Sequence, residues 1–173
     1  MSNPMEKVRH LWRKRPLRLG IEILVILLVF MSVKAYTQRD MVDGAAPPLQ
    51  GQLLSGKTFQ LSKQSSRPVL LHFWATWCPI CKLEQDSIQS LSQDYNVITV
   101  AMQSGSDAEV SAFLKKQGLS FAVINDSDGH LAQRFGVRAV PASFIIDDKN
   151  RIRFRETGLT SGWGLRARLW WSR

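Results

Sequence analysis

The chain contains only two cysteines in 173 residues, Cys78 and Cys81. They close the stretch FWATWCPIC, residues 73–81, which follows an apolar run. Two thiols at this spacing can form a structural disulfide, half of a metal site, or a redox-active pair. Each of these sites needs different surroundings, so the rest of the sequence discriminates between them.

The first two kinds of site fit poorly. A structural disulfide between these residues would close a loop of about four residues, and chain entropy gives it only roughly 2 kcal/mol. A structural zinc ion takes four Cys, His or carboxylate ligands. The sequence offers no second cysteine pair, and its three histidines are scattered at His10, His72 and His130.

A redox-active pair fits the elements that position it. Residues 68–75, PVLLHFWA, form a continuous apolar run that predicts a buried parallel strand. The apolar residues after Pro79 follow one helical stripe, and proline is favoured in the first helical turn. Cys78 therefore lies at a helix N-terminus, where backbone N–H groups and the helix dipole favour a thiolate, the species that attacks disulfides. Cys81, one turn inside, is placed to resolve the mixed disulfide.

The remaining pattern predicts an α/β fold, with a mixed central sheet flanked by helices and an N-terminal β-hairpin extension. Ser106 and Glu109 form a capping box before a helix that Gly118 ends. The other expected elements are a hairpin over 49–61, strands over 96–102 and 121–125, a short helix over 129–135, a hairpin over 142–156 that turns at 147–150, and a C-terminal helix.

The N-terminal part predicts a membrane anchor. Residues 19–36 are apolar except for Glu22, Ser32 and Lys34, and as a helix they span roughly 27 Å, enough for a bilayer core. Six Lys and Arg precede this segment, whereas only Lys34 near its end and Arg39 after it are positively charged on the other side, so the N-terminus stays cytoplasmic and the rest is exported. A signal peptide cleaved after Ala35 is the alternative, and it exports the same domain.

We therefore predict four parts of the chain: a cytoplasmic basic segment over 1–18, a transmembrane anchor over 19–36, a linker over 37–48 and a folded domain over 49–173. The linker is predicted because MVDGAAPP, at 41–48, is small, contains Gly and Pro, and has no apolar period. In a bacterium this arrangement puts the domain in the periplasm, on the inner membrane.

The net charge of +9 does not indicate a nucleic-acid partner, because the charge lies at the two ends. Residues 1–40 carry eight Lys and Arg against three acids, and residues 149–173 carry seven against one. The middle of the chain, residues 41–148, carries eight against ten, so the folded body is close to neutral.

The stretches FWATWCPIC and GVRAVPASFIID, at 136–147, together resemble the thioredoxin superfamily. They are similar to its exported, membrane-tethered branch that includes TlpA, ResA and CcmG. The ending GLTSGWGLRARLW, at 158–170, resembles the suppressor-of-copper-sensitivity D group in particular. The likeness covers about residues 45–173 and implies a thioredoxin fold and thiol–disulfide exchange through both cysteines, with no organic cofactor.

The resemblance also implies a cis-proline that faces the cysteines, and this position falls on Pro141. A cis Val140–Pro141 bond would expose backbone to an incoming peptide strand. An ordinary trans proline at a sheet edge is the alternative. We assign Trp77, Pro79, Val140 and Pro141 to substrate binding.

Two ionisable residues are candidates for proton transfer. Glu84 shares a helical face with Cys81, three residues earlier, and the family carries a buried glutamate near the resolving cysteine. A solvated helix carboxylate is the alternative. His72 stands where thioredoxins have aspartate and the TlpA-like branch commonly has asparagine. It is either a proton relay or a hydrogen-bonded core residue.

The sequence therefore predicts a periplasmic, membrane-anchored enzyme that reduces disulfides of exported proteins, with electrons from a membrane donor of the DsbD/ScsB type. The reductive direction is favoured because Pro79-Ile80 carries no histidine or positive charge that would further stabilise a thiolate. A Cu(I)-binding chaperone that uses the two thiolates, together with Met102, is the alternative. For the C-terminal helix, we expect the leucines to pack inward while the tryptophans and arginines rest on the membrane surface. The alternative is that one face of the helix packs on the sheet and the rest is solvated.

Overall fold

The computed structural model describes residues 4–64 and 68–172, with side chains from Arg18 onward. The chain divides into two compact units, residues 1–36 and residues 37–173. The predicted basic segment before Arg18 lies outside the described side chains, as does Arg173.

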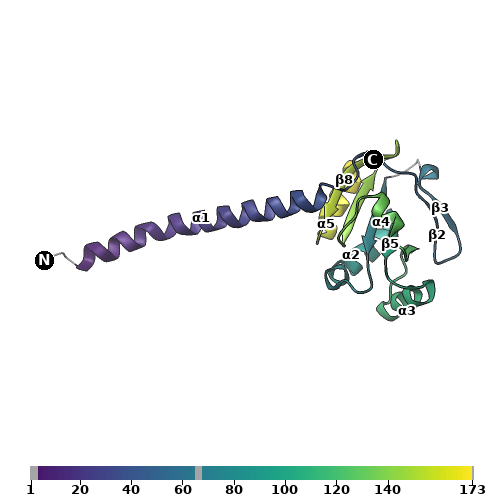
Figure 1. Cartoon of the computed structure of the whole chain (residues 1–173), viewed down its shortest axis with the longest axis horizontal. Helices are drawn as coiled ribbons and strands as arrows, with labels where there is room; N and C mark the ends of the chain where they lie inside the picture. The colour runs from purple at the N-terminus through teal and green to yellow at the C-terminus, as the bar shows by residue number, and fades with distance from the viewer. Residues whose placement is uncertain (1–3, 65–67, 173) are drawn as a thin grey trace. The chain divides into compact units, whose positions relative to one another are not determined.

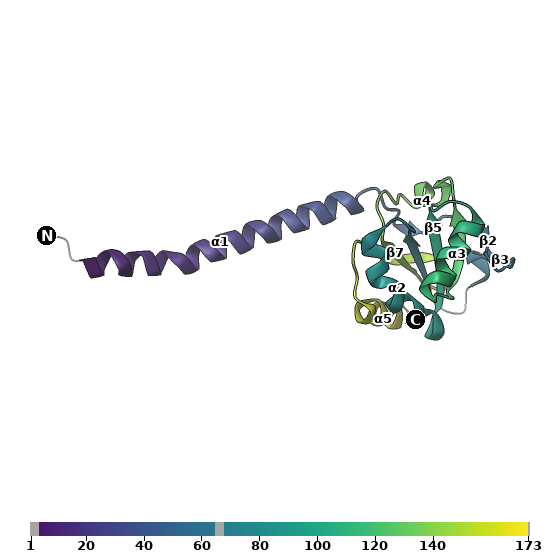
Figure 2. The same ribbon diagram turned by 90° about the horizontal axis from the view of Figure 1, so that it is seen from below.

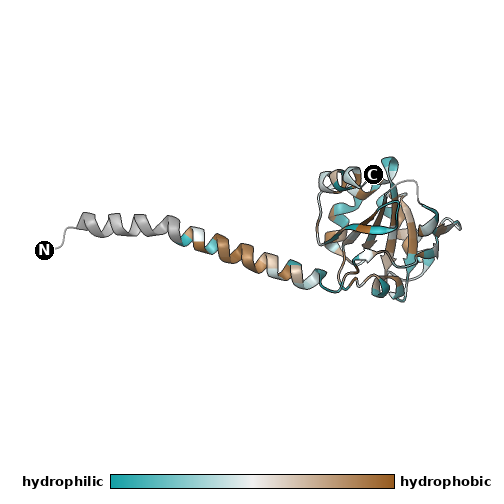
Figure 3. Cartoon of the chain, turned by 90° about the horizontal axis from the view of Figure 1, so that it is seen from above, coloured by the Kyte–Doolittle hydropathy of each residue, from teal (hydrophilic) through white to brown (hydrophobic). Residues whose placement is uncertain are grey.

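The first unit consists of most of one long helix, α1 (Pro4–Gln38). The helix stretch Arg18–Gln38 has a mean hydropathy of 2.1, and Figure 3 shows it as largely hydrophobic. The apolar window within this stretch contains no buried residue. Among the described residues this is the one helix whose length and composition suit a membrane span, and a signal sequence would have the same properties.

The second unit is built on a six-stranded mixed sheet with the strand order β1-β8-β7-β4-β5-β6 (Figures 1 and 2). Strands β4, β5 and β6 run parallel, while β7, β8 and β1 are antiparallel to their neighbours. The sheet strands are β1 (Gly44–Ala45), β4 (Val69–Trp74), β5 (Asn96–Met102), β6 (Ala122–Asp126), β7 (Ala142–Ile146) and β8 (Arg151–Thr157). The other elements are the hairpin β2 (Gln50–Gln52) and β3 (Thr58–Gln60), the 3-10 turn η1 (Leu61–Lys63), and the helices α2 (Pro79–Asp94), α3 (Asp107–Gln117), α4 (His130–Arg134) and α5 (Gly162–Trp171).

Strand side chains alternate between the two faces of the sheet, so each face carries its own apolar cluster. Helices cover both faces. Leu70 and Trp74 of β4 belong to a core cluster with residues of α2, α3 and α5. Phe73, on the opposite face of the same strand, packs with Phe135 and with apolar residues from segment 41–61. The predicted mixed sheet between helices is therefore confirmed, and both cysteines belong to the first cluster.

Local signals located the elements well. Ser106 and Glu109 form the predicted capping box, and Gly118 ends α3 in the left-handed conformation that favours glycine. The hairpin predicted at 49–61 is β2–β3, and the hairpin predicted at 142–156 is β7–β8. Pro79 is the first residue of α2.

The segment 37–48 differs from the expected linker. Gly44 and Ala45 form β1, which pairs with β8 at the edge of the sheet, and Met41 is buried in the core. A Cβ on Gly136 would overlap the carbonyl oxygen of Asp40, so the backbone of this segment packs directly on the turn after α4. The absence of a side chain at Gly136 allows this close approach. The segment forms an edge strand here and is not a free tether.

Candidate active site

The two cysteines lie at the junction between β4 and α2. Cys78 is the N-cap residue of α2, and its Sγ accepts a hydrogen bond of 3.1 Å from the backbone N–H of Cys81. The structure holds the pair as a disulfide, with both residues buried. When the disulfide is reduced, the same N–H group and the helix N-terminus are placed to stabilise a Cys78 thiolate.

The proline loop lies beside this pair. The peptide bond between Val140 and Pro141 is cis, as the family resemblance implies. The carbonyl oxygen of Val140 lies 3.6 Å from Cys78 Sγ, and the carbonyl oxygen of Pro141 accepts a hydrogen bond of 2.9 Å from the N–H of Gly158. The loop therefore brings backbone to the cysteine sulfur and is itself held by the turn that follows β8.

Trp77 and Pro79 lie at the exposed rim of the site. The indole Nε1–H of Trp77 donates a hydrogen bond of 3.0 Å to the carbonyl oxygen of Gln103. Next to it, the N–H of Thr76 donates to Ser104 Oγ, also over 3.0 Å. The loop after β5 thus holds the residues before Cys78 in place. Sequence reasoning missed Gln103 and Ser104, because no local signal relates them to a motif some 26 residues earlier.

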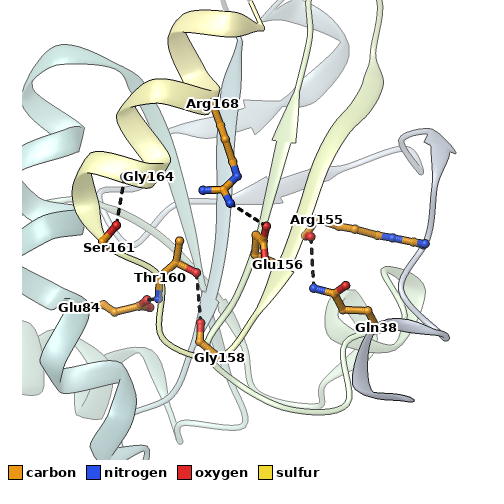
Figure 4. A network of polar contacts seen from close by, with 9 residues as sticks. All are labelled: Gln38, Glu84, Arg155, Glu156, Gly158, Thr160, Ser161, Gly164 and Arg168. Carbon is orange, nitrogen blue, oxygen red and sulfur yellow. Dashed lines mark hydrogen bonds and ion pairs between the residues drawn. The ribbon is translucent and has the colours of Figure 1, made fainter. Parts of the chain in front are cut away.

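Glu84 is buried on the second turn of α2, so the alternative of a solvated helix carboxylate does not describe it. Its Oε1 accepts a hydrogen bond from the backbone N–H of Thr160, while Oε2 is buried and has no hydrogen-bond partner among the residues that the structure describes (Figure 4). Burial raises the pKa of Glu84 to about 7, and the Thr160 N–H opposes that rise. A carboxyl with this pKa can exchange a proton near neutral pH. The sequence offered no signal for Thr160.

His72 is buried on β4, on the same sheet face as Leu70 and Trp74. Its Nδ1 lies 2.9 Å from Ser143 Oγ, directly across the β4–β7 pair. Burial lowers its pKa to about 4, so the imidazole is neutral at physiological pH. This contact gives His72 the features of a hydrogen-bonded core residue, and the relay role stays a prediction.

The cysteine pair has no ready set of metal ligands around it. Among the residues that the structure describes, no group of three His, Cys, Asp or Glu side chains could hold a metal ion. Met102 belongs to the core cluster on the face of the sheet opposite the cysteines.

Comparisons with known proteins agree with this geometry. The Redoxin family model matches residues 41–162. A thioredoxin-like protein of Haemophilus influenzae is 34% identical over 161 residues, which are 92% of this chain and 96% of the relative. The thiol:disulfide interchange protein DsbE of Tatumella citrea is 30% identical, over 85% of this chain and 86% of its own length.

A solved structure agrees as well. The exposed lipoprotein thioredoxin of Streptococcus pneumoniae superposes with a TM-score of 0.64 at 26% identity, and the match covers 71% of this chain and 98% of that one. The sheet order, the cysteine pair on a helix N-terminus and the adjoining cis-proline are thus those of a thioredoxin fold. The chain belongs to the Redoxin family and is a thioredoxin-like thiol–disulfide oxidoreductase.

Proposed function

We propose that this oxidoreductase is a membrane-tethered periplasmic reductase of protein disulfides. The observation that carries the exchange chemistry of this proposal is the buried carboxyl of Glu84, one helical turn from the buried Cys81, with a pKa raised to about 7. A resolving thiol that is shielded from water needs a nearby proton acceptor before it can attack, and Glu84 is suited to that role.

The reaction begins with the reduced pair. The Cys78 thiolate attacks one sulfur of a substrate disulfide, so that a mixed disulfide forms and one substrate thiolate leaves. Glu84 then takes the proton of the Cys81 thiol. The Cys81 thiolate attacks Cys78 Sγ, which forms the Cys78–Cys81 disulfide and releases the second substrate thiolate. The protein dithiol has lost two electrons and the substrate disulfide has gained them.

Substrate is held by backbone and by the exposed rim. The Val140–Pro141 loop offers its backbone beside Cys78, which suits an extended peptide strand that adds alongside it. The exposed ring of Trp77, held by the Gln103 carbonyl oxygen, and the exposed Pro79 flank Cys78 in the sequence and offer apolar surface. This arrangement accepts an unfolded or flexible polypeptide around its cysteine and makes few demands on side-chain identity.

The N-terminal helix supports the proposed location. The span Arg18–Gln38 suits an anchor, and the basic residues before it favour a cytoplasmic N-terminus. The domain then lies in the periplasm at the inner membrane. Each turnover leaves the pair oxidised, so a membrane donor of the DsbD/ScsB type is proposed to reduce it again.

A second candidate function is Cu(I) binding by the two reduced thiolates, in line with the resemblance to the suppressor-of-copper-sensitivity D group. Cys78 and Cys81 would supply two soft ligands, with Met102 as the third residue expected from the sequence. The placement of Met102 in the opposite core cluster favours the reductase instead. Anaerobic Cu(I) titration of the reduced chain, set against its rate of insulin reduction, discriminates between the two functions.

The test of the reductase is to trap its intermediate. Cys81→Ser should accumulate mixed disulfides with exported proteins, because Cys78 can still attack but nothing resolves the product. Cys78→Ser is the matched control and should trap nothing. Alkylation of the wild-type chain in cells should find a mostly reduced pool that becomes oxidised when the donor pathway is removed. Equal trapping by both variants, or a pool that is oxidised with or without the donor, contradicts the proposal.

A further inference from the structure

Helix α5 turns three large aromatic side chains away from the domain. Leu165 and Leu169 are buried against the sheet, as expected from the sequence. Trp163, Trp170 and Trp171 are 85%, 66% and 71% exposed, and we call these three residues the tryptophan face. Tryptophan gains much from burial, so an exposed group of three within nine residues marks a surface that meets another apolar phase.

The exposure of the tryptophan face is a fixed property of the folded domain. Ser161 caps α5 through a hydrogen bond of 3.2 Å from the N–H of Gly164 to its Oγ (Figure 4). One turn before the end of the helix, Arg168 pairs with Glu156 of β8 over 3.0 Å. Together with the two buried leucines, these contacts hold α5 in the orientation that leaves the tryptophans exposed.

The end of the apolar helix reaches the same strand. Thr37 Oγ1 lies 3.2 Å from Thr157 Oγ1, and Gln38 Nε2 donates a hydrogen bond of 3.4 Å to the carbonyl oxygen of Arg155. Strand β8 therefore contacts both the last residues of the apolar span and α5 (Figure 4). Segment 37–48 is therefore packed on the domain and is not a free linker.

The charge of this region suits an anionic surface. Residues 149–173 carry seven Lys and Arg against a single acid, whereas residues 41–148 are close to neutral. Arg166 is paired with Asp94, and Arg168 is paired with Glu156. On an anionic surface, the indole rings would therefore supply most of the binding affinity, and the net positive charge would add a weaker attraction. Tryptophan with neighbouring arginine is the composition that proteins place at the membrane–water interface.

We propose that the tryptophan face rests in the headgroup region of the anionic membrane that holds the anchor. The inference depends on the membrane tether of the proposed function, but not on the direction of electron flow. A weak surface affinity is enough, because the tether keeps the face at high effective concentration near the lipid. Contact through α5 would limit rotation of the domain about its anchor and hold the cysteine pair in one orientation toward membrane partners.

The test uses tryptophan fluorescence of the full chain in nanodiscs of phosphatidylcholine and phosphatidylglycerol, with one chain in each disc. Trp12→Phe is introduced throughout, because Trp12 belongs to the segment before the span. In the chain that carries only Trp12→Phe, lipids with a quencher near the headgroup should strongly quench the tryptophan fluorescence. The triple variant W163S/W170S/W171S should lose more than half of the lipid-dependent quenching, whereas the control Trp77→Phe should keep it.

Separate readouts distinguish failure of this inference from failure of the function. Flotation with the discs reports the tether, and insulin reduction in the same discs reports thiol exchange. If the chain floats and reduces insulin but the tryptophan face is not quenched by labelled lipid, the inference is wrong while the function stands. Shielding of the face from aqueous iodide without lipid quenching would mean that a protein covers it, which also overturns the inference.

Discussion

His72 on β4 and Glu84 on α2 are both buried ionisable residues on the cysteine side of the sheet, yet their surroundings differ. The imidazole Nδ1 of His72 contacts the hydroxyl of Ser143 on the neighbouring strand. One carboxyl oxygen of Glu84 accepts a hydrogen bond from the backbone of Thr160, and the other has no hydrogen-bond partner within the described part of the chain. Burial drives both groups toward their neutral forms, but only Glu84 ends with a pKa near physiological pH.

We expect this difference to separate a structural group, His72, from a reactive one, Glu84. A neutral imidazole that is bonded across two strands stabilises the sheet and does not titrate between pH 6 and 8. Glu84 has a buried oxygen without a hydrogen bond, which is energetically unfavourable, and a pKa near 7. Such unsatisfied groups and shifted pKa values are more frequent at functional sites. The variants below test this separation.

The largest effect is expected from Glu84→Gln. The amide keeps the shape of the side chain and can still accept the Thr160 hydrogen bond, but it cannot take the Cys81 proton. Resolution of the mixed disulfide at pH 7 should slow by about 100-fold, the lower range for loss of a general base. Stopped-flow measurement across pH 5–9 should also lose the inflection near pH 7.

The control for Glu84→Gln is Glu109→Gln, which removes an exposed capping carboxylate on α3. It should leave the rate and its pH dependence unchanged. A Glu84→Gln profile that matches the wild type would remove Glu84 from the mechanism.

The next effect is expected from His72→Leu, and it concerns stability. The substitution leaves the Ser143 hydroxyl buried without its partner, which should lower the free energy of unfolding by about 1–3 kcal/mol. Urea denaturation measures the loss, and adding Ser143→Ala should recover part of it, because both polar groups are then gone. The rate of disulfide resolution at pH 7 should stay within about two-fold. A displaced pH–rate profile in His72→Leu would instead support the proton relay.

The smallest effect is expected in the pH dependence of stability. Between pH 4 and its ordinary pKa of 6.5, His72 binds fewer protons in the folded chain than in the unfolded chain. Its contribution to the free energy of unfolding therefore rises with pH from about 4 to 6.5. Glu84 acts in the opposite sense. Its folded pKa of about 7 lies above the ordinary 4.5, so the folded state loses stability as pH rises through that window.

Glu84→Gln removes the contribution of Glu84 to the pH dependence of stability and leaves that of His72. The variant should therefore gain stability relative to the wild type between pH 4.5 and 7, by about 1 kcal/mol after allowance for solvent screening. Urea midpoints at pH 4.5 and 7.5 measure this gap, and a gap that is the same at both pH values would contradict the raised pKa.

Features that depend on neighbours in sequence could be predicted. The spacing of Cys78 and Cys81, the apolar strand before them and Pro79 at the start of the helix located the reactive pair, because helix ends and buried strands are short-range patterns. The capping box of α3 and the two hairpins were predictable for the same reason. Segment 37–48 was mistaken for a linker, because small residues and prolines are equally typical of a free tether and of a short edge strand.

The sequence by itself determined the enzyme class, the two cysteines and the positions of most elements, since each depends on residues a few places apart. Only the tertiary structure decided which groups meet across long separations. Thr160 reaches Glu84 over 76 residues and Ser143 reaches His72 over 71, and no local pattern encodes either contact. These distant contacts, together with the burial that the assembled sheet and helices impose, set the two pKa values. Desolvation of an ionisable group exists only once the surrounding layers have packed around it.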